Sequence, residues 1–147
     1  MEKILPLRPF MRSLQSKAEI NLDSAEVLHT KGYYPSVAHC SYYSCFQLVR
    51  HIWLNSLGKT ESELKQLIAS FKDNKAVEKG SHDVLINQIT THIKLNNEGD
   101  FRVFNNNIGQ LKRLRHSADY DDVGFSFQES EKSIYLSKLI RPVLKRY

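Results

Sequence analysis

Residues 35–57 carry little charge over most of their length, and small side chains are interspersed with large apolar ones. At helical spacing the segment presents two occupied faces, Val37, Ser41, Ser44, Leu48 and Ile52 on one and Ala38, Tyr42, Cys45, Val49 and Trp53 on the other. A helix with two such faces has to be covered on both, and small side chains let neighbouring helices approach closely. We therefore expect this helix to lie at the centre of a bundle or at an interface.

The rest of the chain also follows the helical period of 3.6 residues, and no segment shows the alternation of a strand. Further helices are expected over residues 9–31, 60–71, 81–95, 100–118 and 126–147, with loops over 72–80 and 119–125. Capping boxes at Thr60 and Ser126 and a capping Asp100 mark three of the starts. The last helix is expected to turn Leu136, Leu139, Ile140 and Val143 inward and to kink or fray at Pro142. We predict a single domain over residues 1–147, an all-α up-and-down bundle of four main helices plus one short helix.

Composition and spacing argue against several classes of protein. No stretch approaches the ~20 apolar residues of a membrane span, and residues 1–17 lack the apolar core of a signal peptide. Cys40 and Cys45 are five residues apart, which places them about 140° apart around a helix and makes a disulfide between them unfavourable. The six histidines show no metal-ligand spacing. We expect a cytoplasmic protein without a membrane segment, a metal or a cofactor.

The chain is basic, with a net charge of +5, and residues 132–147 contain five basic side chains and no acidic one. One interpretation is a solvated helix whose cations match the negative end of the helix dipole, with Glu129 and Glu131 near its start. The other interpretation is a surface for nucleic acid. The pattern fits the first interpretation better, because basic charge permits contact with nucleic acid without requiring it.

The end of the helix expected over residues 100–118 carries a charge in an apolar position. The apolar stripe of this helix is Phe101, Phe104, Ile108 and Leu111, and the next step of four residues reaches Arg115. An arginine on a core-facing stripe needs a carboxylate partner, and Asp119 follows one turn later. Two interpretations stay open, a structural ion pair that ends the helix and a site at which Arg115 binds a ligand.

Two motifs together resemble the HEPN domain superfamily, in its small stand-alone prokaryotic branch. Residues 32–46 read Gly-Tyr-Tyr-Pro-Ser-Val-Ala-His-Cys-Ser-Tyr-Tyr-Ser-Cys-Phe, and Arg115 is followed by Ala118, Asp119, Tyr120 and Asp121. In this family a small-residue helix with a Tyr-Tyr pair precedes an R-x-x-A-D-Y-D segment. The resemblance covers residues 10–143 and implies an all-α, HEPN-like bundle that commonly forms a symmetric dimer. Many relatives are metal-independent ribonucleases, and several are toxins paired with a nucleotidyltransferase antitoxin.

The family's catalytic pattern is an arginine that holds phosphate, followed four to six residues later by a histidine that acts as acid and base. Arg115 matches the arginine, but Tyr120 stands in the histidine position, and His116 is displaced by about 100° around the helix. A tyrosine with a pKa of ~10 is a poor base at neutral pH. This departure argues against strong ribonuclease activity, and Tyr120 fits a core or interface aromatic better than a catalyst.

The sequence favours a HEPN-type helical homodimer that acts as a binding module for protein and for RNA or a nucleotide. Its expected binding residues are Lys112, Arg113, Arg115 and Asp119, and its expected partner is a nucleotidyltransferase-like protein in a toxin–antitoxin or defence system. The alternative is a metal-independent endoribonuclease with a degenerate centre, in which Arg115 holds phosphate and His116 or Tyr120 moves protons. A helical bundle without a nucleic-acid role is the third interpretation.

Overall fold

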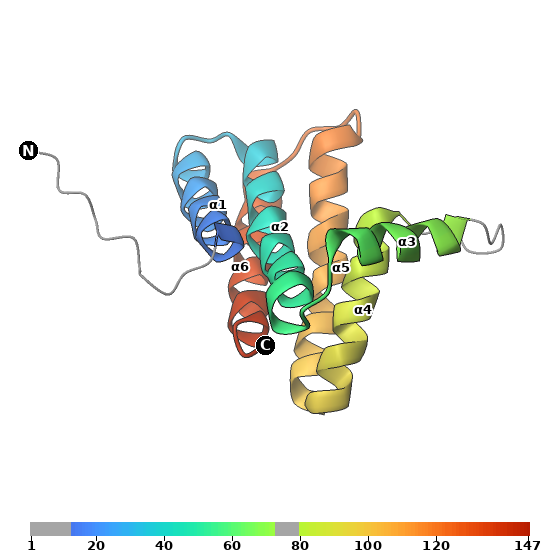
Figure 1. The fold of residues 1–147 in the computed structure, drawn as a ribbon. Coiled ribbons are helices and arrows are strands. Elements are labelled where there is room, and N and C mark those ends of the chain that lie inside the picture. The colour runs from blue at the N-terminus through green and yellow to red at the C-terminus, as the bar shows by residue number, and fades with distance from the viewer. Residues whose placement is uncertain (1–12, 73–79) are drawn as a thin grey trace, which may run out of the picture.

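The computed structural model of the chain describes residues 13–72 and 80–147, and every regular element in these ranges is helical (Figure 1). The elements are α1 Ser13–Thr30, α2 Tyr34–His51, the π-helix η1 Ile52–Ser56, α3 Glu61–Lys72, α4 Ser81–Asn96, α5 Glu98–Tyr120 and α6 Phe127–Leu144. The all-α prediction is thereby confirmed. The first residues of the helix expected over 9–31 and most of the loop expected over 72–80 lie outside the described residues.

Five of the described α-helices are long and α3 is short. Every expected helical range is thus present, and counting α6 with the main helices gives five long helices instead of four. α6 is a full-length helix because it has three neighbours to pack against, α1, α2 and α5. α3 instead runs across the direction of the long helices and packs against α4 (Figure 1). Over the two described ranges, none of these helices has the length and apolar character needed to cross a membrane.

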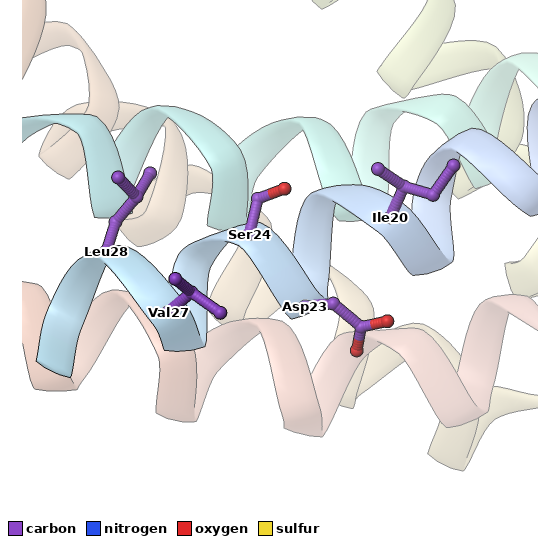
Figure 2. Close-up of a pocket in the computed structure, with 5 residues that line it drawn as sticks. All are labelled: Ile20, Asp23, Ser24, Val27 and Leu28. Carbon is purple, nitrogen blue, oxygen red and sulfur yellow. The ribbon is translucent and has the colours of Figure 1, made fainter. Parts of the chain in front are cut away.

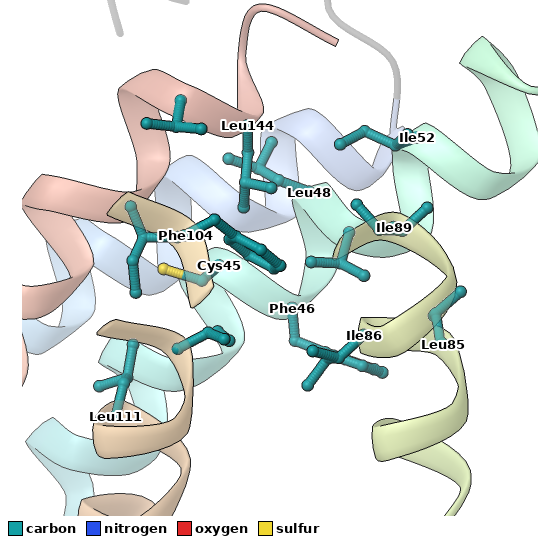
Figure 3. Close-up of a cluster of buried hydrophobic side chains, with 14 of the residues drawn as sticks. Cys45, Phe46, Leu48, Ile52, Leu85, Ile86, Ile89, Phe104, Leu111 and Leu144 are labelled. Atoms are coloured by element: carbon teal, nitrogen blue, oxygen red, sulfur yellow. The ribbon is translucent and has the colours of Figure 1, made fainter. Parts of the chain in front are cut away.

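The expected central position of α2 is confirmed. This helix packs against α1, α4, α5 and α6, and nine of its 18 residues are buried. One apolar cluster joins it to its neighbours and includes Cys45, Phe46 and Leu48 of α2, Ile86 and Ile89 of α4, Phe104 and Leu111 of α5 and Leu144 of α6 (Figure 3). The small residues Ala38 and Cys45 are fully buried, so neighbouring helices reach close to the backbone of α2.

A seam of buried serines joins α2 to α6. Ser44 Oγ lies 2.6 Å from Ser137 Oγ, and the Ser133 hydroxyl donates to Ser41 Oγ at 3.1 Å. All four side chains are fully buried, and a buried hydroxyl that loses its partner destabilises the fold. These four residues, the serine seam, therefore fix the register in which α6 packs on α2.

The helix expected over residues 35–57 is not α-helical to its end. Its last turn is the π-helix η1, in which the Leu57 backbone N–H donates to Ile52 O at 2.8 Å. Gly58 then turns the chain at a φ of +63°, which favours glycine. The wider turn places the Trp53 indole under the connection to α3, where its Nε1–H donates to Thr60 O at 3.0 Å.

The helix starts follow the expected capping chemistry, with two corrections. Thr60 and Ser126 accept from the backbone N–H of Glu63 and Glu129 at 3.0 and 3.1 Å, and each glutamate carboxylate meets the capping hydroxyl rather than the backbone. The cap of α5 is Asn97, whose Oδ1 accepts from the Asp100 N–H at 2.8 Å. Asp100 was the expected cap, but its carboxylate is used elsewhere, because it accepts from the Tyr147 hydroxyl at 2.8 Å and pairs with Arg146.

The buried face of α6 differs from the expected stripe. Leu136, Ile140 and Val143 are buried as expected, but Leu139 is 37% exposed. The reason is that the buried face of α6 also includes Ser137 and Arg141. This face is therefore rotated away from Leu139, which points toward solvent. Pro142 lies inside α6, and the helix ends two residues later at Leu144.

Most of the basic residues near the C-terminus form ion pairs with acidic side chains of the same chain. Lys138 pairs with Glu26 at 2.8 Å, Arg141 and Lys145 pair with Glu19 at 2.6 and 2.8 Å, and Arg146 pairs with Asp100. Arg141 is only 3% exposed, so the interpretation as a solvated helix is wrong at this position. The basic run chiefly attaches α6 to α1 and to the start of α5.

Candidate functional site

Arg115 lies in the second-last turn of α5, on the face that packs against α2. Its side chain is 14% exposed, which agrees with its place on the core-facing stripe. The Asp119 carboxylate lies one turn further along, with Oδ2 at 2.9 Å from Arg115 Nε. The expected ion pair is therefore present, and α5 continues to Tyr120, two residues beyond the expected end.

Three tyrosine rings surround the guanidinium of Arg115. The Arg115 Cζ atom lies 5.6, 5.5 and 5.4 Å from the ring centres of Tyr42, Tyr43 and Tyr120, respectively. Such distances allow cation–π attraction, which holds the cation in place without using its N–H donors. Tyr42 is fully buried, whereas Tyr120 is 65% exposed, so of the two positions expected for Tyr120 the core is excluded and a dimer interface stays a prediction.

The hydrogen-bond donors of Arg115 are only partly used. The contact of Nε with Asp119 is close enough for an ion pair, but its direction does not make a hydrogen bond, and within the described ranges Nε has no hydrogen-bond acceptor. Nη2 reaches the hydroxyls of Tyr43 and Tyr120, each at the long distance of 3.4 Å. Because Nε is buried, the donor capacity that Arg115 keeps for an anion is that of its two terminal nitrogens, which carry four of the five guanidinium N–H groups.

His39 of α2 completes the group from the other side of the carboxylate. Its Nδ1 lies 2.9 Å from Asp119 Oδ2, its ring packs 4.8 Å from the ring of Tyr43, and its side chain is 47% exposed. Sequence reasoning missed this residue, because 80 positions separate it from Asp119. One signal was available, since the spacing of four residues from His39 to Tyr43 places both on one face of α2.

His82 and Lys112 close the inner side of the site. His82 Nδ1 lies 2.8 Å from the Tyr42 hydroxyl, and its ring stacks on Phe46 with the ring centres 3.9 Å apart. Burial lowers the pKa of His82, and the positive charges of Arg115 and Lys112 lower this pKa further. Burial also raises the pKa of Tyr42. Both groups are therefore uncharged near neutral pH, and the positive charge of Arg115 remains concentrated at the site.

The other expected site residues are divided between two faces of α5. Lys112 lies on the side of Arg115 and forms an ion pair with Asp83. Arg113 is exposed on the other side, in a groove of about 290 Å³ that is lined by Gln110, Arg113, Leu114, Ser117, Glu129 and Lys132. His116 is exposed, and its ring lies 5.0 Å from the ring of Tyr120. The structure thus brings Lys112, Arg115, Asp119 and Tyr120 together but leaves Arg113 apart.

The chemistry available at this site is that of an anion-binding cation beside an imidazole. Among the described side chains, no group of three or more His, Cys, Asp or Glu is arranged to hold a metal ion. Cys40 and Cys45 are free thiols, as expected. Burial raises the pKa of Cys40, and the charge of Asp119 raises it further, so this thiol is a weak nucleophile near the site.

A second hollow lies on the outer face of α1 and differs in character (Figure 2). It has a volume of about 400 Å³ and is lined by Ile20, Asp23, Ser24, Val27 and Leu28. Ile20 and Val27 are 63% and 55% exposed, seven residues apart on one side of the helix. This surface is mainly apolar, and its residues carry none of the chemistry found around Arg115.

Comparison with known protein families matches residues 11–147 to the family described as HEPN domain. The match covers all of the helices described above. No curated protein and no solved structure matches the chain.

Proposed function

The chain belongs to the HEPN domain family, and we propose that it acts as a homodimeric binding module whose Arg115 site holds a phosphate group of RNA or of a nucleotide. The observation that carries this proposal is the loose hydrogen bonding at the outer end of Arg115, where Nη2 makes two bonds at the long distance of 3.4 Å. Nε is buried against Asp119 and is not offered to a ligand. Phosphate suits such a cation, because the planar guanidinium can donate two parallel hydrogen bonds to it.

The aromatic surroundings support a nucleic-acid ligand over a simple anion. Tyr120 is largely exposed beside Arg115, and Tyr43 lies partly exposed between Arg115 and His39. Exposed aromatic rings next to a cation are suited to stacking on unpaired bases whose phosphates the cation holds. We therefore expect a preference for single-stranded over double-stranded RNA.

The binding proposal is tested by titrating labelled single-stranded RNA with the purified chain at several salt concentrations. Arg115→Gln should weaken binding about ten-fold or more and lower the slope of log K against log salt by roughly 0.7, the loss of one phosphate contact. Arg102→Gln is the matched control, because Arg102 lies on the same helix, is 72% exposed and pairs with Glu98. Equal effects of the two changes would contradict an Arg115 site.

The dimer is the second part of the proposal, and the outer face of α1 is the surface that supports it. Exposed Ile20 and Val27 form an apolar strip on this helix, and a two-fold symmetric pair can cover the same strip on both copies. Light scattering at tens of micromolar (a rough range for a specific pair) should show a dimer that Val27→Asp dissociates. Leu95→Asp is the control, because Leu95 is 82% exposed on α4. A dimer that both variants retain would place the interface elsewhere.

The proposed protein partner is a nucleotidyltransferase-like protein, in a toxin–antitoxin or defence system. This part rests on the family resemblance, and co-expression of the chain with the product of an adjacent nucleotidyltransferase gene tests it. A stable complex during size-exclusion chromatography is expected, and its absence at micromolar concentrations would remove this partner from the proposal.

A further inference from the structure

We propose that the groove between α5 and α6 is a second phosphate subsite, formed by Arg113 and Lys132, and that the ligand is therefore a strand of RNA rather than a single nucleotide. This inference rests on the proposed function, because the same strand has another of its phosphates on Arg115. The groove is the hollow of about 290 Å³ described above, and its lining comes from the second half of α5 and the first turns of α6.

Arg113 differs from the other arginines of the described ranges, because no carboxylate neutralises its charge. Each of the others forms an ion pair: Arg50 with Glu61, Arg102 with Glu98, Arg115 with Asp119, Arg141 with Glu19 and Arg146 with Asp100. Arg113 is exposed and, among the residues that the structure describes, forms neither an ion pair nor a hydrogen bond. All of its N–H donors can therefore bind an anion.

The Arg113 side chain lies along α5 instead of extending into solvent. A Cβ atom added at Gly109, one turn earlier, would lie 3.5 Å from Arg113 Nη1. Because Gly109 has no side chain, the guanidinium has room to lie against the helix, beside the groove that it lines. A cation that is already held at the surface loses less conformational entropy when it binds a ligand.

Lys132 supplies a second unpaired cation from the other helix. It lies in the second turn of α6, and its side chain lines the same groove. Within the described ranges it forms no ion pair, whereas Lys138, further along α6, pairs with Glu26 at 2.8 Å. Two like charges that line one hollow repel each other, and an anion between them replaces this repulsion by attraction.

The charge of the lining matches a backbone phosphate of RNA. Arg113 and Lys132 contribute two positive charges and Glu129 one negative charge, which leaves a net charge of +1. The Glu129 carboxylate accepts from the Ser126 hydroxyl at 3.2 Å, at the start of α6. The Ser117 hydroxyl adds a donor that, among the described residues, has no hydrogen-bond partner. A phosphodiester carries one negative charge and accepts such bonds on its non-bridging oxygens.

The exposed face of α5 connects this groove with Arg115. His116, Ser117 and Tyr120 lie three, four and seven residues beyond Arg113, which places them on one side of the helix. His116 and Tyr120 are exposed, their rings lie 5.0 Å apart, and the Tyr120 hydroxyl is 3.4 Å from Arg115 Nη2. Bases between the two phosphates can stack on these rings. The subsites lie on different sides of a helix about 10–12 Å across, so a strand can reach both and one phosphate cannot.

The test measures the affinity of the full chain for UMP and for single-stranded oligouridylates of up to about eight nucleotides. Wild-type affinity should rise with length until the strand reaches the groove. The double change Arg113→Gln and Lys132→Gln should weaken binding of the longest strand about ten-fold and lower the slope of log K against log salt by roughly 0.7. Its affinity for UMP should stay unchanged. The matched control is Arg102→Gln with Lys138→Gln, which removes the same charge from the same two helices outside the groove.

A second variant changes the groove in the opposite direction. Glu129→Gln removes the negative charge of the lining and keeps a residue that completes a capping box, so α6 should keep its start. Affinity for the longest strand should rise about two- to five-fold, without a change for UMP. Glu131→Gln is the control, because it removes the same charge two residues further on, at an exposed position that does not line the groove. Equal gains in both variants would contradict a subsite at the groove.

The outcomes separate this inference from the proposed function. Binding that depends on Arg115 but is unchanged in the double variant would reject the second subsite and leave the proposed function standing. UMP that binds as tightly as the longest strand would reject it as well. Groove variants that bind RNA normally but no longer bind a hexaglutamate peptide would assign the groove to an acidic protein instead. RNA binding that is independent of Arg115 would reject the proposed function itself.

Discussion

Arg115 and Arg141 both turn toward the interior from the last turns of a long helix, but the chain holds them in opposite ways. Arg141 donates to the backbone carbonyls of Ala18 and Ser44 at 3.2 and 2.8 Å and to the Glu19 carboxylate at 2.6 Å. Arg115 meets aromatic rings and one carboxylate, and within the described ranges its Nε finds no hydrogen-bond acceptor.

The difference separates a structural cation from one that can bind a ligand. The three partners of Arg141 belong to α1 and α2, so this arginine joins both helices to α6. The partners of Arg115 restrict its position but leave donors free. Burial alone does not distinguish the two roles, because both side chains are largely covered. The useful criterion is how many N–H groups of the arginine already have acceptors.

The largest effect is expected for Arg141→Ala. This change removes the guanidinium that bonds Glu19 and two backbone carbonyls in the interior, and the free energy of unfolding should fall by about 3–5 kcal/mol in urea titrations. Lys145→Ala is the control, since Lys145 also pairs with Glu19 but is 51% exposed, and it should cost less than about 1 kcal/mol. Similar losses for both variants would show that the contact with Glu19, rather than the bonds from Arg141 to the backbone carbonyls, stabilises the fold.

Arg115→Ala should have a smaller effect on stability and a larger one on RNA binding. Its partner Asp119 is 21% exposed and keeps His39 as a neighbour, so the loss should be about 1–2 kcal/mol, between the ranges for exposed and buried pairs. Urea titrations and RNA affinities should be measured for both Arg115→Ala and Arg141→Ala. They test whether Arg141 is the structural arginine and Arg115 the one that binds a ligand. A greater loss of stability for Arg115→Ala would reverse the assignment of the two arginines.

The part of the pH dependence of stability that is due to His82 should depend on the charge of Arg115. The folded-state pKa of His82 is lowered from the ordinary value of 6.5, so the unfolded chain binds a proton more readily than the folded one. The stability due to this group is present above pH 6.5 and is lost as the pH falls below it, by at most about 1.4 kcal/mol per pH unit. Unfolding measured from pH 8 to 5 should show a flatter dependence for His82→Gln and for Arg115→Ala than for the wild type. Unchanged slopes would mean that His82 does not sense this charge.

The smallest effect is expected for Tyr120→Phe. The change keeps the ring beside Arg115 and removes a hydroxyl whose contact with Nη2 is long, at 3.4 Å. Stability should therefore change by less than about 0.5 kcal/mol, and RNA affinity should stay close to the wild-type value. A large loss of RNA cleavage in this variant would instead assign a chemical role to the Tyr120 hydroxyl.

Much of this arrangement follows from local sequence patterns. The stripe that ends in Arg115, and Asp119 one turn later, predicted the ion pair, because neighbours at four-residue spacing on one helix meet whatever the tertiary fold. The two-faced segment that became α2 predicted a central helix for a similar reason. Both inferences depend on a single helix and its period.

The remaining features depend on which helices meet. His39 reaches Asp119 across the α2–α5 contact. The spacing from His39 to Tyr43 indicates a shared face of α2 but not that this face meets Asp119. The buried role of Arg141 was hidden among the neighbouring cations of the C-terminal segment, because its acceptors lie on α1 and α2. The π-turn at the end of α2 was missed as well, since it reflects how Trp53 packs under the connection to α3.

The serine seam has a consequence for how the molecule can move. A helix that slides along its neighbour advances about 1.5 Å per residue, and a shift of that size would break both hydroxyl pairs at once. We therefore expect α2 and α6 to move as one rigid body. The site has its imidazole on α2 and its cation and carboxylate on α5. A partner that displaces α5 would thus separate the two halves of the site, whereas one that presses on α6 would carry α2 along with it.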